Sequence, residues 1–462
     1  MSTIASAVPA AGAHDPSGDG AGIQYAWTQL VSHSDTTRIL LRVIVADGAG
    51  CERLARYAKS GATVVMKRRP NPHKERFRID LCEALLDLDD AGVRLKNGSA
   101  LTWESIADRP PNRIAVIGDS GCRTEAKQSC GEPKDWGFPR VTAAASFLDE
   151  GPPDLTIHVG DYRYRGSDDW SNWKADFFEP MRPLLAAAPF VAVRGNHDNC
   201  YRGKGFGWKY LLAPTTEFAD CPKGGTAEIE PSYALRLGDL HLVVIDSADT
   251  NYRCKSWDAS VGAENGKYLK ALSALLDAPD RRYWLLSHYP IFDVRTSEAC
   301  SQDASASCPT CDSLWPFHER IVPLLLGRKI DAVISGDIHD YRAMHVETAD
   351  AAWKTLQFVV GHSGAILDQY DAIVPGCRAV APPQSVYCAG TLGNNLGYKT
   401  DYPFKLRRRN VFGFMAAVRD AAGKVWRFDM RPAARGDQED EAECHVPAGG
   451  SLACIETAKP PG

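Results

Sequence analysis

The chain has 462 residues, of which 44% are hydrophobic and 24% are charged, a composition typical of a globular protein with a large core. The formal net charge of -5 argues against general nucleic-acid binding, because a phosphate backbone requires a strongly basic face. No run of about 18 or more apolar residues is present, which argues against a membrane-spanning helix. We therefore expect no nucleic-acid partner and no membrane span, and the oligomeric state stays open.

The chain contains 14 cysteines, an even and unusually high number. Several lie in loop-like sequence near a second cysteine: Cys122 with Cys130, Cys377 with Cys388, and Cys444 with Cys454. Cytosolic proteins rarely keep disulfides, so this usage predicts an oxidising compartment and a secreted or periplasmic protein. Cys308 and Cys311 have metal-finger spacing, but Cys300 is close and no second such pair exists. Disulfides are therefore favoured there over a redox pair or a zinc site.

Residues 1–23 are small and polar and lack the basic and apolar regions of a signal peptide. Either a signal peptide has been removed or export uses another route; we favour the former and expect a disordered leader. Residues 24–110 predict a small β-rich domain, because residues 38–45, 63–66 and 77–80 are strand-like. A short helix is an alternative for residues 51–60. We expect Cys51 and Cys82 to bridge this domain, which ends at Pro110-Pro111.

Residues 111–432 alternate strand-like with helical runs, which predicts an α/β fold with a central sheet covered by helices. The predicted strands are residues 114–117, 155–159, 190–193, 242–245, 284–286 and 332–334, and the predicted helices are residues 141–148, 173–185, 267–276 and 317–326. Residues 296–314 and 369–402 are predicted insertions, and residues 411–418 and 424–430 a closing hairpin. Residues 433–462 form a predicted tail, anchored by Cys444 and Cys454.

Five short segments supply polar side chains, and nearly every one follows an apolar, β-branched run. They are Gly118-Asp119-Ser120-Gly121, Gly160-Asp161-Tyr162-Arg163-Tyr164, Gly195-Asn196-His197-Asp198, Ser287-His288-Tyr289-Pro290 and Gly336-Asp337-Ile338-His339. Open α/β folds build their sites where strands end, so we expect these segments to meet. Two neighbouring cations require a bridging anion and a mixture of oxygen and nitrogen ligands. Aspartate, asparagine and histidine in this arrangement therefore predict a two-metal site.

The order of these segments resembles the calcineurin-like metallophosphoesterase superfamily. Tyr164, three residues after Asp161, resembles the tyrosine that ligates a ferric ion in the purple acid phosphatase branch. The resemblance covers about residues 112–430 and includes 232–235 and 241–247, which are similar to the family's strand pair. It implies a four-layer α/β/β/α sandwich as the catalytic domain, preceded by the small β-rich domain. It also implies two metal ions, iron with iron, zinc or manganese.

Carried over by position, the resemblance implies a role for each polar residue. Asp119, Tyr164 and His339 would hold the first metal, Asn196 and His288 the second, and Asp161 would lie between them. His197 would protonate the leaving alkoxide, and Asp198 would orient the His197 ring. His362 and Arg163 are candidate substrate contacts, and Arg165, Trp170 and Trp173 lie on a predicted rim loop. His158 and His241 are interpreted as structural.

The chain departs from the family at Asp337, where the family motif Gly-His-x-His has its first histidine. We expect Asp337 to ligate the second metal, and a harder, more anionic site then favours Fe, Mn or Mg over Zn. The alternative is a damaged second site.

The resemblance implies a phosphatase in which a metal-activated hydroxide attacks a phosphomonoester and His197 donates the proton. Two alternatives stay open. The first is a phosphodiesterase or nucleotidase on the same scaffold, and the second is a non-catalytic binding protein with a degraded second metal site.

Overall fold

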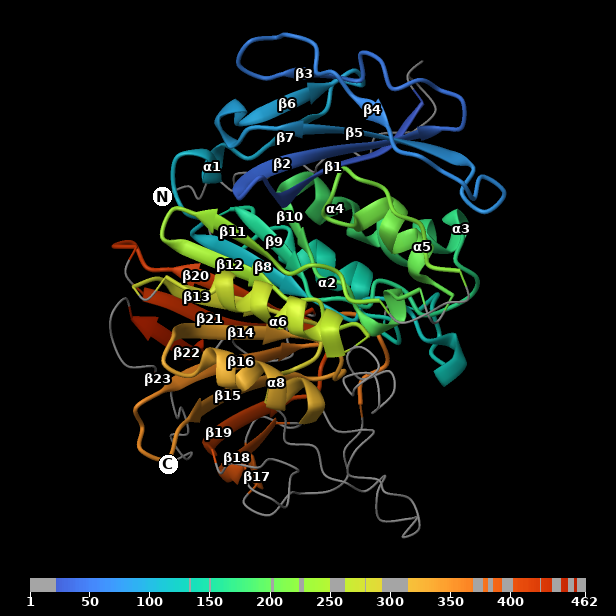
Figure 1. Cartoon of the computed structure of the whole chain (residues 1–462). Coiled ribbons are helices and arrows are strands. Elements are labelled where there is room, and N and C mark those ends of the chain that lie inside the picture. Colours follow the sequence, from blue (N-terminus) through green and yellow to red (C-terminus); the bar gives the residue numbers. More distant parts are fainter. Residues whose placement is uncertain are drawn as a thin grey trace, which may run out of the picture.

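The computed structural model describes residues 22–132, 134–148, 151–200, 203–223, 228–249, 262–278, 280–292, 315–368, 377–380, 385–392, 402–423, 425–433, 442–447 and 453–454 (Figure 1). Several expectations fall outside the described residues: nearly all of the leader, the insertion at 296–314 with Cys300, Cys308 and Cys311, and most of the tail. The division of the chain at residues 110 and 432 stays a prediction.

The larger of two sheets has 11 strands. Its centre is parallel, because β8 pairs with β9, β9 with β10 and β10 with β1, whereas the strands on either side are antiparallel. In spatial order the strands are β23 (Ala453–Cys454), β22 (Ala442–Pro447), β21 (Val425–Pro432), β20 (Gly413–Arg419), β8 (Arg113–Ile117), β9 (Leu155–His158), β10 (Phe190–Ala192), β1 (Ile23–His33), β2 (Thr36–Ala46), β5 (Ile79–Leu86) and β4 (Lys67–Arg68). The predicted closing hairpin is confirmed as β20 and β21.

The second sheet has nine strands, and its parallel part is β12, β13, β14 and β16. In spatial order its strands are β11 (Tyr233–Leu237), β12 (Leu240–Val244), β13 (Arg282–Leu286), β14 (Lys329–Ser335), β16 (Lys354–Val360), β15 (Tyr341–Glu347), β19 (Tyr402–Arg409), β18 (Ser385–Leu392) and β17 (Cys377–Val380). Each of the six strands predicted between residues 114 and 334 is present, with ends that differ from the prediction by at most three residues.

The sheets face each other, and helices cover their outer faces (Figure 1). Ile114 of β8 and Leu242 of β12 belong to the core between the sheets, whereas their neighbours Ala115 and Val243 pack outward against helices. A strand that is buried on both faces has a continuous run of apolar residues in its sequence. The layers therefore follow the α/β/β/α order that the resemblance implies.

The helical segments are mostly short. They are η1 (Leu88–Asp90), α1 (Glu104–Ala107), η2 (Thr124–Ala126), α2 (Phe138–Ala145), α3 (Trp170–Trp173), η3 (Lys174–Phe178), α4 (Glu179–Ala187), η4 (Asn196–Asp198), α5 (Gly205–Gly207), η5 (Trp208–Leu212), α6 (Gly262–Leu275) and α8 (Trp315–Leu325). The predicted helix at 173–185 is interrupted by the π-helical turn η3. Within the described residues, no helix combines the length and apolar character that a membrane span requires.

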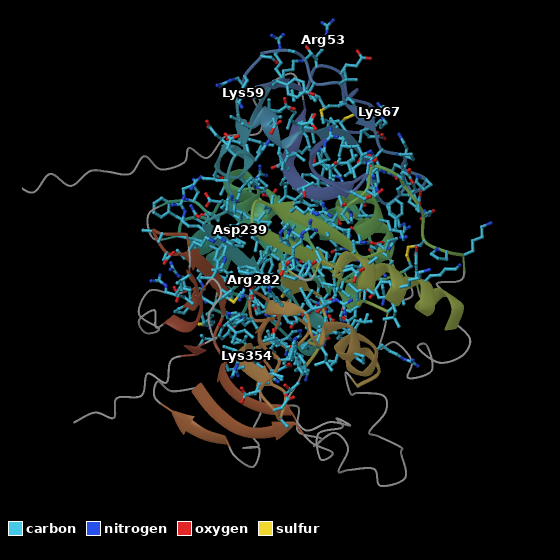
Figure 2. All side chains as sticks on the ribbon, turned by 60° about the vertical axis from the view of Figure 1, so that its left-hand side comes forward. Arg53, Lys59, Lys67, Asp239, Arg282 and Lys354 are labelled. Carbon is cyan, nitrogen blue, oxygen red and sulfur yellow. A yellow bond between two sulfur atoms is a disulfide. The ribbon has the colours of Figure 1, made fainter. Side chains whose placement is uncertain are left out.

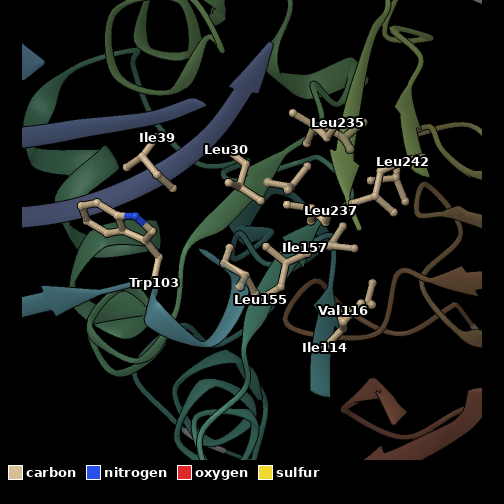
Figure 3. Close-up of a cluster of buried hydrophobic side chains, with 14 of the residues drawn as sticks. Leu30, Ile39, Trp103, Ile114, Val116, Leu155, Ile157, Leu235, Leu237 and Leu242 are labelled. Carbon is tan, nitrogen blue, oxygen red and sulfur yellow. The ribbon is translucent and has the colours of Figure 1, made fainter. Parts of the chain in front are cut away.

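The N-terminal strands continue the large sheet. Leu30 of β1 and Ile39 of β2 share one hydrophobic core with Leu155 and Ile157 of β9 (Figure 3). A small sheet of β3 (Ala55–Tyr57), β6 (Gly92–Leu95) and β7 (Ala100–Thr102) lies on this β-rich region. Residues 51–60 contain strand β3, so the alternative of a short helix there was wrong, and the strand predicted at residues 63–66 is only an isolated bridge at Thr63. Thr63 pairs with Arg56, seven residues earlier in the chain.

Buried arginines join the N-terminal strands to η5 and to Ala213, which follows it. The Arg42 guanidinium donates to the carbonyl oxygens of Leu211 and Ala213, both at 2.8 Å, and Arg69 donates to the Lys209 carbonyl at 2.9 Å. Glu83 lies between the two cations, with its Oε2 3.1 Å from Arg69 Nη1. Arg69 is therefore an internal residue, although Arg53, Lys59 and Lys67 of the same region point outward (Figure 2).

Three disulfides are present among the described side chains. Cys51–Cys82 and Cys122–Cys130 confirm two predicted pairs, and Cys200–Cys221 was not predicted. Cys377 lies opposite Cys388, and Cys444 opposite Cys454, in the backbone register of antiparallel strands. The backbone thus brings the cysteines of the two other predicted pairs to neighbouring positions.

Candidate metal centre

The five polar segments meet where parallel strands of both sheets end. Asp119 follows β8, Asp161 follows β9 and Asn196 follows β10, all in the large sheet. His288 follows β13 and Asp337 follows β14 in the second sheet. Because the two sheets face each other, side chains from both converge on one place. This is the location that the strand-end argument predicts.

Three aspartates of the centre have the same unusual backbone. Asp119, Asp161 and Asp337 lie in the left-handed region, with φ of 51°, 60° and 67°. Such a conformation costs on the order of 1–3 kcal/mol for a residue with a side chain and is typical of functional sites. The glycine before each aspartate is also required: a Cβ on Gly118 would lie 2.4 Å from Val159 Cγ2, and one on Gly336 2.4 Å from Asp119 Oδ2. Each Gly-Asp pair therefore makes a tight turn that presents a carboxylate.

Tyr164 joins three of the predicted ligands. Its hydroxyl lies 3.0 Å from Asp119 Oδ1, 2.9 Å from Asp161 Oδ2 and 3.1 Å from His339 Nε2. The Tyr164 side chain is fully buried. Three potential ligand groups from three segments thus lie within hydrogen-bonding distance of one phenol oxygen.

His288 marks a second group of candidate ligands. Its Nε2 lies 3.5 Å from Asp161 Oδ1 and 3.9 Å from Asp337 Oδ1. Asn196 Nδ2 lies 3.4 Å from the same Asp337 oxygen and donates to the Tyr289 hydroxyl at 2.7 Å. Asp119, Asp161 and His288 each offer one atom within 4.8 Å of the others, as in a metal site. The Asp161 carboxylate therefore contacts both the residues around Tyr164 and the residues around His288.

The donor atoms fit metal ions. Asn196 Oδ1 and His288 Nε2 are buried and have no hydrogen-bond partner in the described part of the chain. His288 Nδ1 donates to the Val159 carbonyl at 2.8 Å, and His339 Nδ1 donates to the Ile366 carbonyl at 3.0 Å. These bonds place the proton of each neutral ring on Nδ1 and leave the Nε2 lone pair for a ligand.

Clustered carboxylates also perturb the titration of the centre. Burial raises the pKa of Asp119 to about 6, although His339 and His288 oppose that shift. Burial would lower the pKa of His288, but the carboxylates of Asp161, Asp119 and Asp337 outweigh it and raise the pKa well above its ordinary value. A cation at the centre would relieve the repulsion among these carboxylates.

Residues 112–341 match the model of the calcineurin-like phosphoesterase family. These residues form a calcineurin-like phosphoesterase domain. The family hydrolyses phosphoesters with divalent metal ions, so the chain carries a domain for metal-dependent phosphoester hydrolysis. The structure thereby bears out the predicted family and fold class, whereas the purple acid phosphatase branch stays a prediction.

Other comparisons are less informative. No curated protein sequence matches the chain. Among solved structures, GAP50 of Plasmodium, described as the anchor in the inner membrane complex, is 14% identical with a TM-score of 0.41, over 76% of this chain and 91% of that chain. A cold-active protein tyrosine phosphatase is 8% identical with a TM-score of 0.25, over 91% of this chain and 97% of that chain. Both TM-scores are too low to carry an argument.

In the phosphoesterase domain, His197 and Asp198 follow Asn196 in η4. The His197 N–H donates to Asp161 Oδ1 at 2.8 Å, and the half-buried His197 ring lies 4.4 Å from the Tyr164 ring. The buried Asp198 carboxylate accepts the backbone N–H groups of Asp161 at 2.8 Å, Gly195 at 3.0 Å and Tyr162 at 3.3 Å. Asp198 thus joins the turns of two ligands, and its orientation of the His197 ring stays a prediction.

The two candidate substrate residues are buried. Arg163 Nη1 donates to the Arg165 carbonyl at 2.6 Å, and its Nη2 lies 3.6 Å from Asp168 Oδ1. The His362 ring lies 5.4 Å from the Tyr341 ring, and its carbonyl accepts the Gly413 N–H. Direct contact of either residue with substrate stays a prediction.

Residues of the predicted rim loop pack inward. Arg165 pairs with Asp176, and the Trp173 indole N–H donates to Asp168 Oδ1 at 2.8 Å. Trp170 is partly buried and stacks edge-on against Tyr25 of β1 at 5.7 Å. These contacts are those of structural packing.

The two histidines interpreted as structural differ in burial. His158 is fully buried behind the centre, where its Nδ1 accepts the Gly160 N–H at 3.2 Å and its Nε2 donates to Ser120 Oγ at 2.8 Å. His241 lies on β12, half-buried near Tyr283.

Sequence analysis missed residues that surround the ligands. Ser247 Oγ accepts the backbone N–H groups of His288 at 3.1 Å and Tyr289 at 2.9 Å. The Arg123 guanidinium carbon lies 5.2 Å from the centre of the Tyr164 ring, and Arg123 Nη1 lies 3.4 Å from His339 Nδ1. Ser247 lies three residues after β12, a strand that the sequence did predict, whereas nothing local to Arg123 indicates its position.

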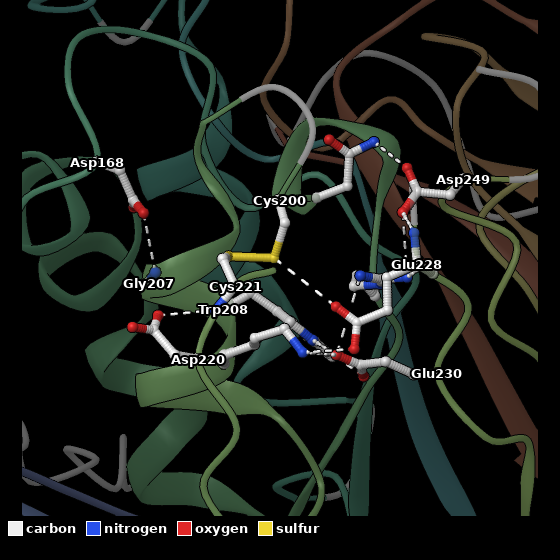
Figure 4. Close-up of a disulfide and its surroundings, with 12 residues drawn as sticks. Asp168, Cys200, Gly207, Trp208, Asp220, Cys221, Glu228, Glu230 and Asp249 are labelled. Carbon is white, nitrogen blue, oxygen red and sulfur yellow. Dashed lines mark hydrogen bonds and ion pairs between the residues drawn. A yellow bond between two sulfur atoms is a disulfide. The ribbon is translucent and has the colours of Figure 1, made fainter. Parts of the chain in front are cut away.

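A largely buried ionic network supports the segment that carries Asn196, and Figure 4 shows its acidic members Glu228, Glu230 and Asp249 together with the Cys200–Cys221 disulfide. Arg194 Nε lies 3.2 Å from Asp246 Oδ1, and the same guanidinium approaches Asp249 at 3.6 Å and Glu230 at 3.9 Å. Lys209 pairs with Glu228 at 2.9 Å. Since Asp246 directly precedes Ser247, this network connects the Asn196 turn with the residue that holds His288. Buried polar networks of this kind fix geometry when their members are satisfied.

Proposed function

We propose that this protein is an acid phosphatase that hydrolyses phosphomonoesters at a two-metal centre, similar to purple acid phosphatases. The observation that carries the proposal is the convergence of Asp119, Asp161 and His339 on the Tyr164 hydroxyl, all within 3.1 Å. In the absence of a cation, ionisation of this phenol is unfavourable, because burial and the carboxylates of Asp119 and Asp161 raise the pKa of Tyr164 well above its ordinary value. Ionisation becomes favourable when a hard cation binds, because phenolate and carboxylate are hard ligands.

In this proposal Asp119, Tyr164 and His339 hold the first metal, and Asn196, His288 and Asp337 hold the second. Asp161 lies between the two, which its contacts with Tyr164 and His288 support. When bound, the metal ions supply a water of lowered pKa and neutralise charge on the phosphoryl oxygens. The pair would be iron with iron, zinc or manganese.

Ligation by Asp337 is supported by its position. Its carboxylate oxygen Oδ1 lies within 3.9 Å of His288 Nε2, on the same side as the buried Asn196. The Asp337 N–H also donates to Asp119 Oδ2 at 3.0 Å. This bond fixes the Gly336-Asp337 turn against Asp119, one of the residues proposed to hold the first metal. A carboxylate at this position favours Fe, Mn or Mg over Zn.

We assign the proton donation to His197. Its backbone is bound to Asp161, so the ring is held beside the centre, and its partial exposure leaves it accessible to a leaving group. A histidine titrates near neutral pH and is suited to donate a proton to a developing alkoxide. The three disulfides support a secreted or periplasmic location.

Metal content and ester hydrolysis test the proposal together. We expect two metal ions per chain, including iron, by mass spectrometry of protein purified without chelators. We expect hydrolysis of p-nitrophenyl phosphate, with loss of turnover in Asp161→Asn. Faster hydrolysis of bis-p-nitrophenyl phosphate would support the phosphodiesterase alternative. Fully metallated wild-type protein that hydrolyses neither ester would contradict the proposal.

A further inference from the structure

A short disulfide-closed loop lies beside the proposed first metal group. The Cys122–Cys130 loop comprises residues 122–130 and begins three residues after Asp119. Gly121, at its start, packs against the backbone of Arg163, where a Cβ would lie 2.4 Å from the Arg163 Cα. The loop is therefore closely packed against the segment that carries Tyr164.

Gln128 is the buried centre of this loop, and all of its hydrogen-bonding capacity is used. Its Oε1 accepts the N–H groups of Arg123 at 2.8 Å and Ile366 at 3.1 Å. Its Nε2 donates to the carbonyl oxygens of Asp135 and Gly364, both at 2.7 Å. A primary amide has two acceptor sites and two N–H donors, so no other side chain of this size makes the same four bonds.

Two of these bonds reach residues 364–366, the turn whose Ile366 carbonyl binds the His339 ring. The Ile366 carbonyl accepts His339 Nδ1–H at 3.0 Å, and Ile366 itself is 37% exposed. Gln128 binds this turn at Gly364 and Ile366, on both sides of Ala365, whose N–H donates to the Asp119 carbonyl at 2.7 Å. The direction of the Ile366 carbonyl, and with it the orientation of the His339 ring, thus depends on Gln128.

We propose that Gln128 is a positioning residue for the ligand His339, and that metal retention by the Asp119, Tyr164 and His339 group depends on the Cys122–Cys130 disulfide. The proposal rests on the proposed function only in taking these three residues as ligands. A dithiol transfers two electrons and two protons to the disulfide, which becomes two cysteine thiols, and is itself oxidised to a disulfide. The opened loop then loses the constraint that keeps Gln128 in contact with the turn.

Gln128→Glu tests the positioning role. The glutamate keeps acceptor oxygens for Arg123 and Ile366 but places a second oxygen against the carbonyl oxygens of Asp135 and Gly364. The full chain is loaded with Co²⁺, and chelator competition and the visible spectrum, which reports ligand geometry, are measured. We expect one of two Co²⁺ sites to weaken about 10–100-fold with an altered spectrum, and the other to keep its affinity. The reference variant His339→Ala should affect the same site more strongly.

The disulfide is tested with a matched pair of double variants. Cys122→Ala/Cys130→Ala should lose Co²⁺ affinity at that site, whereas Cys51→Ala/Cys82→Ala, which removes a disulfide of the N-terminal strands, should keep both sites. Should Gln128→Glu fail to fold, Gln128→Asn, whose shorter amide cannot reach all four partners, supplies the same comparison. Wild-type affinity and spectrum in Gln128→Glu, or equal metal loss in both double variants, would overturn the proposal. Wild-type protein that binds two Co²⁺ but hydrolyses no ester contradicts the proposed function alone.

Discussion

Asp198 Oδ2 accepts the backbone N–H of Asp161 at 2.8 Å, so a carboxylate after β10 fixes the turn after β9. Because the same side chain also binds the N–H groups of Gly195 and Tyr162, two ligand-bearing turns are held by one residue. Their spacing is thereby independent of any bound ion.

Asp198→Asn should destabilise the protein and loosen the metal centre. The amide has one oxygen, so at least one buried N–H group loses its acceptor, at a cost of about 1–3 kcal/mol or more. Urea unfolding of the metal-free protein measures this loss. Unchanged stability would contradict the role of Asp198 in joining the turns.

Tyr164→Phe should remove one ligand of the first metal without a large change in packing. We expect reduced metal content, and loss of visible absorption if the bound ion is ferric iron, because phenolate-to-iron charge transfer needs the oxygen. Absorption spectroscopy after reconstitution with iron is the measurement. An unchanged spectrum in the variant would exclude Tyr164 as a ligand.

His197→Ala should lower turnover about 10²–10⁴-fold while metal content stays unchanged. The loss should be larger for an alkyl phosphate than for p-nitrophenyl phosphate, because an alkoxide needs protonation more than p-nitrophenolate does. Steady-state kinetics with both substrates test this. Equal losses would indicate that His197 does not donate the proton.

Asp337→His restores the family motif Gly-His-x-His and should shift metal preference toward Zn. Asp337→Ala should instead lose the second metal. Competition between Zn²⁺ and Mn²⁺ for each variant, followed by mass spectrometry, measures the preference. An unchanged preference and full metal content in Asp337→Ala would show that this carboxylate is no ligand.

His158 predicts a pH dependence of stability. Burial lowers the pKa of His158 from 6.5 to about 3, so the folded protein keeps this ring neutral. Below pH 6.5 the unfolded chain binds a proton that the folded chain does not, and the unfolding free energy falls by up to about 1.4 kcal/mol per pH unit until about pH 3. Above pH 6.5 the residue has no such effect. Urea unfolding of wild type and His158→Gln at several pH values should give a shallower pH slope for the variant.

The strand ends of the phosphoesterase domain could be predicted because apolar runs and the following Gly-Asp turns are local signals. The candidate ligands Asp119, Asp161 and Asp337 could be predicted for the same reason, whereas Tyr164 was predicted only from the family resemblance. Strand β1 was missed, although it has 11 residues, because polar and apolar residues mix along it and its burial comes from β2 and β10. The roles of Gln128 and Asp198 depend on backbone N–H groups of distant segments, which no local pattern records.

The left-handed backbone at Asp119, Asp161 and Asp337 has a thermodynamic consequence. The protein bears the cost of gathering these carboxylates when it folds, before any ion arrives. Nearly all of the free energy of metal binding therefore adds to the unfolding free energy of the protein. The folded population should rise with the concentration of free metal. In a compartment poor in metal ions, supply of the ion would determine how much of this chain survives proteolysis, as well as how much of it is active.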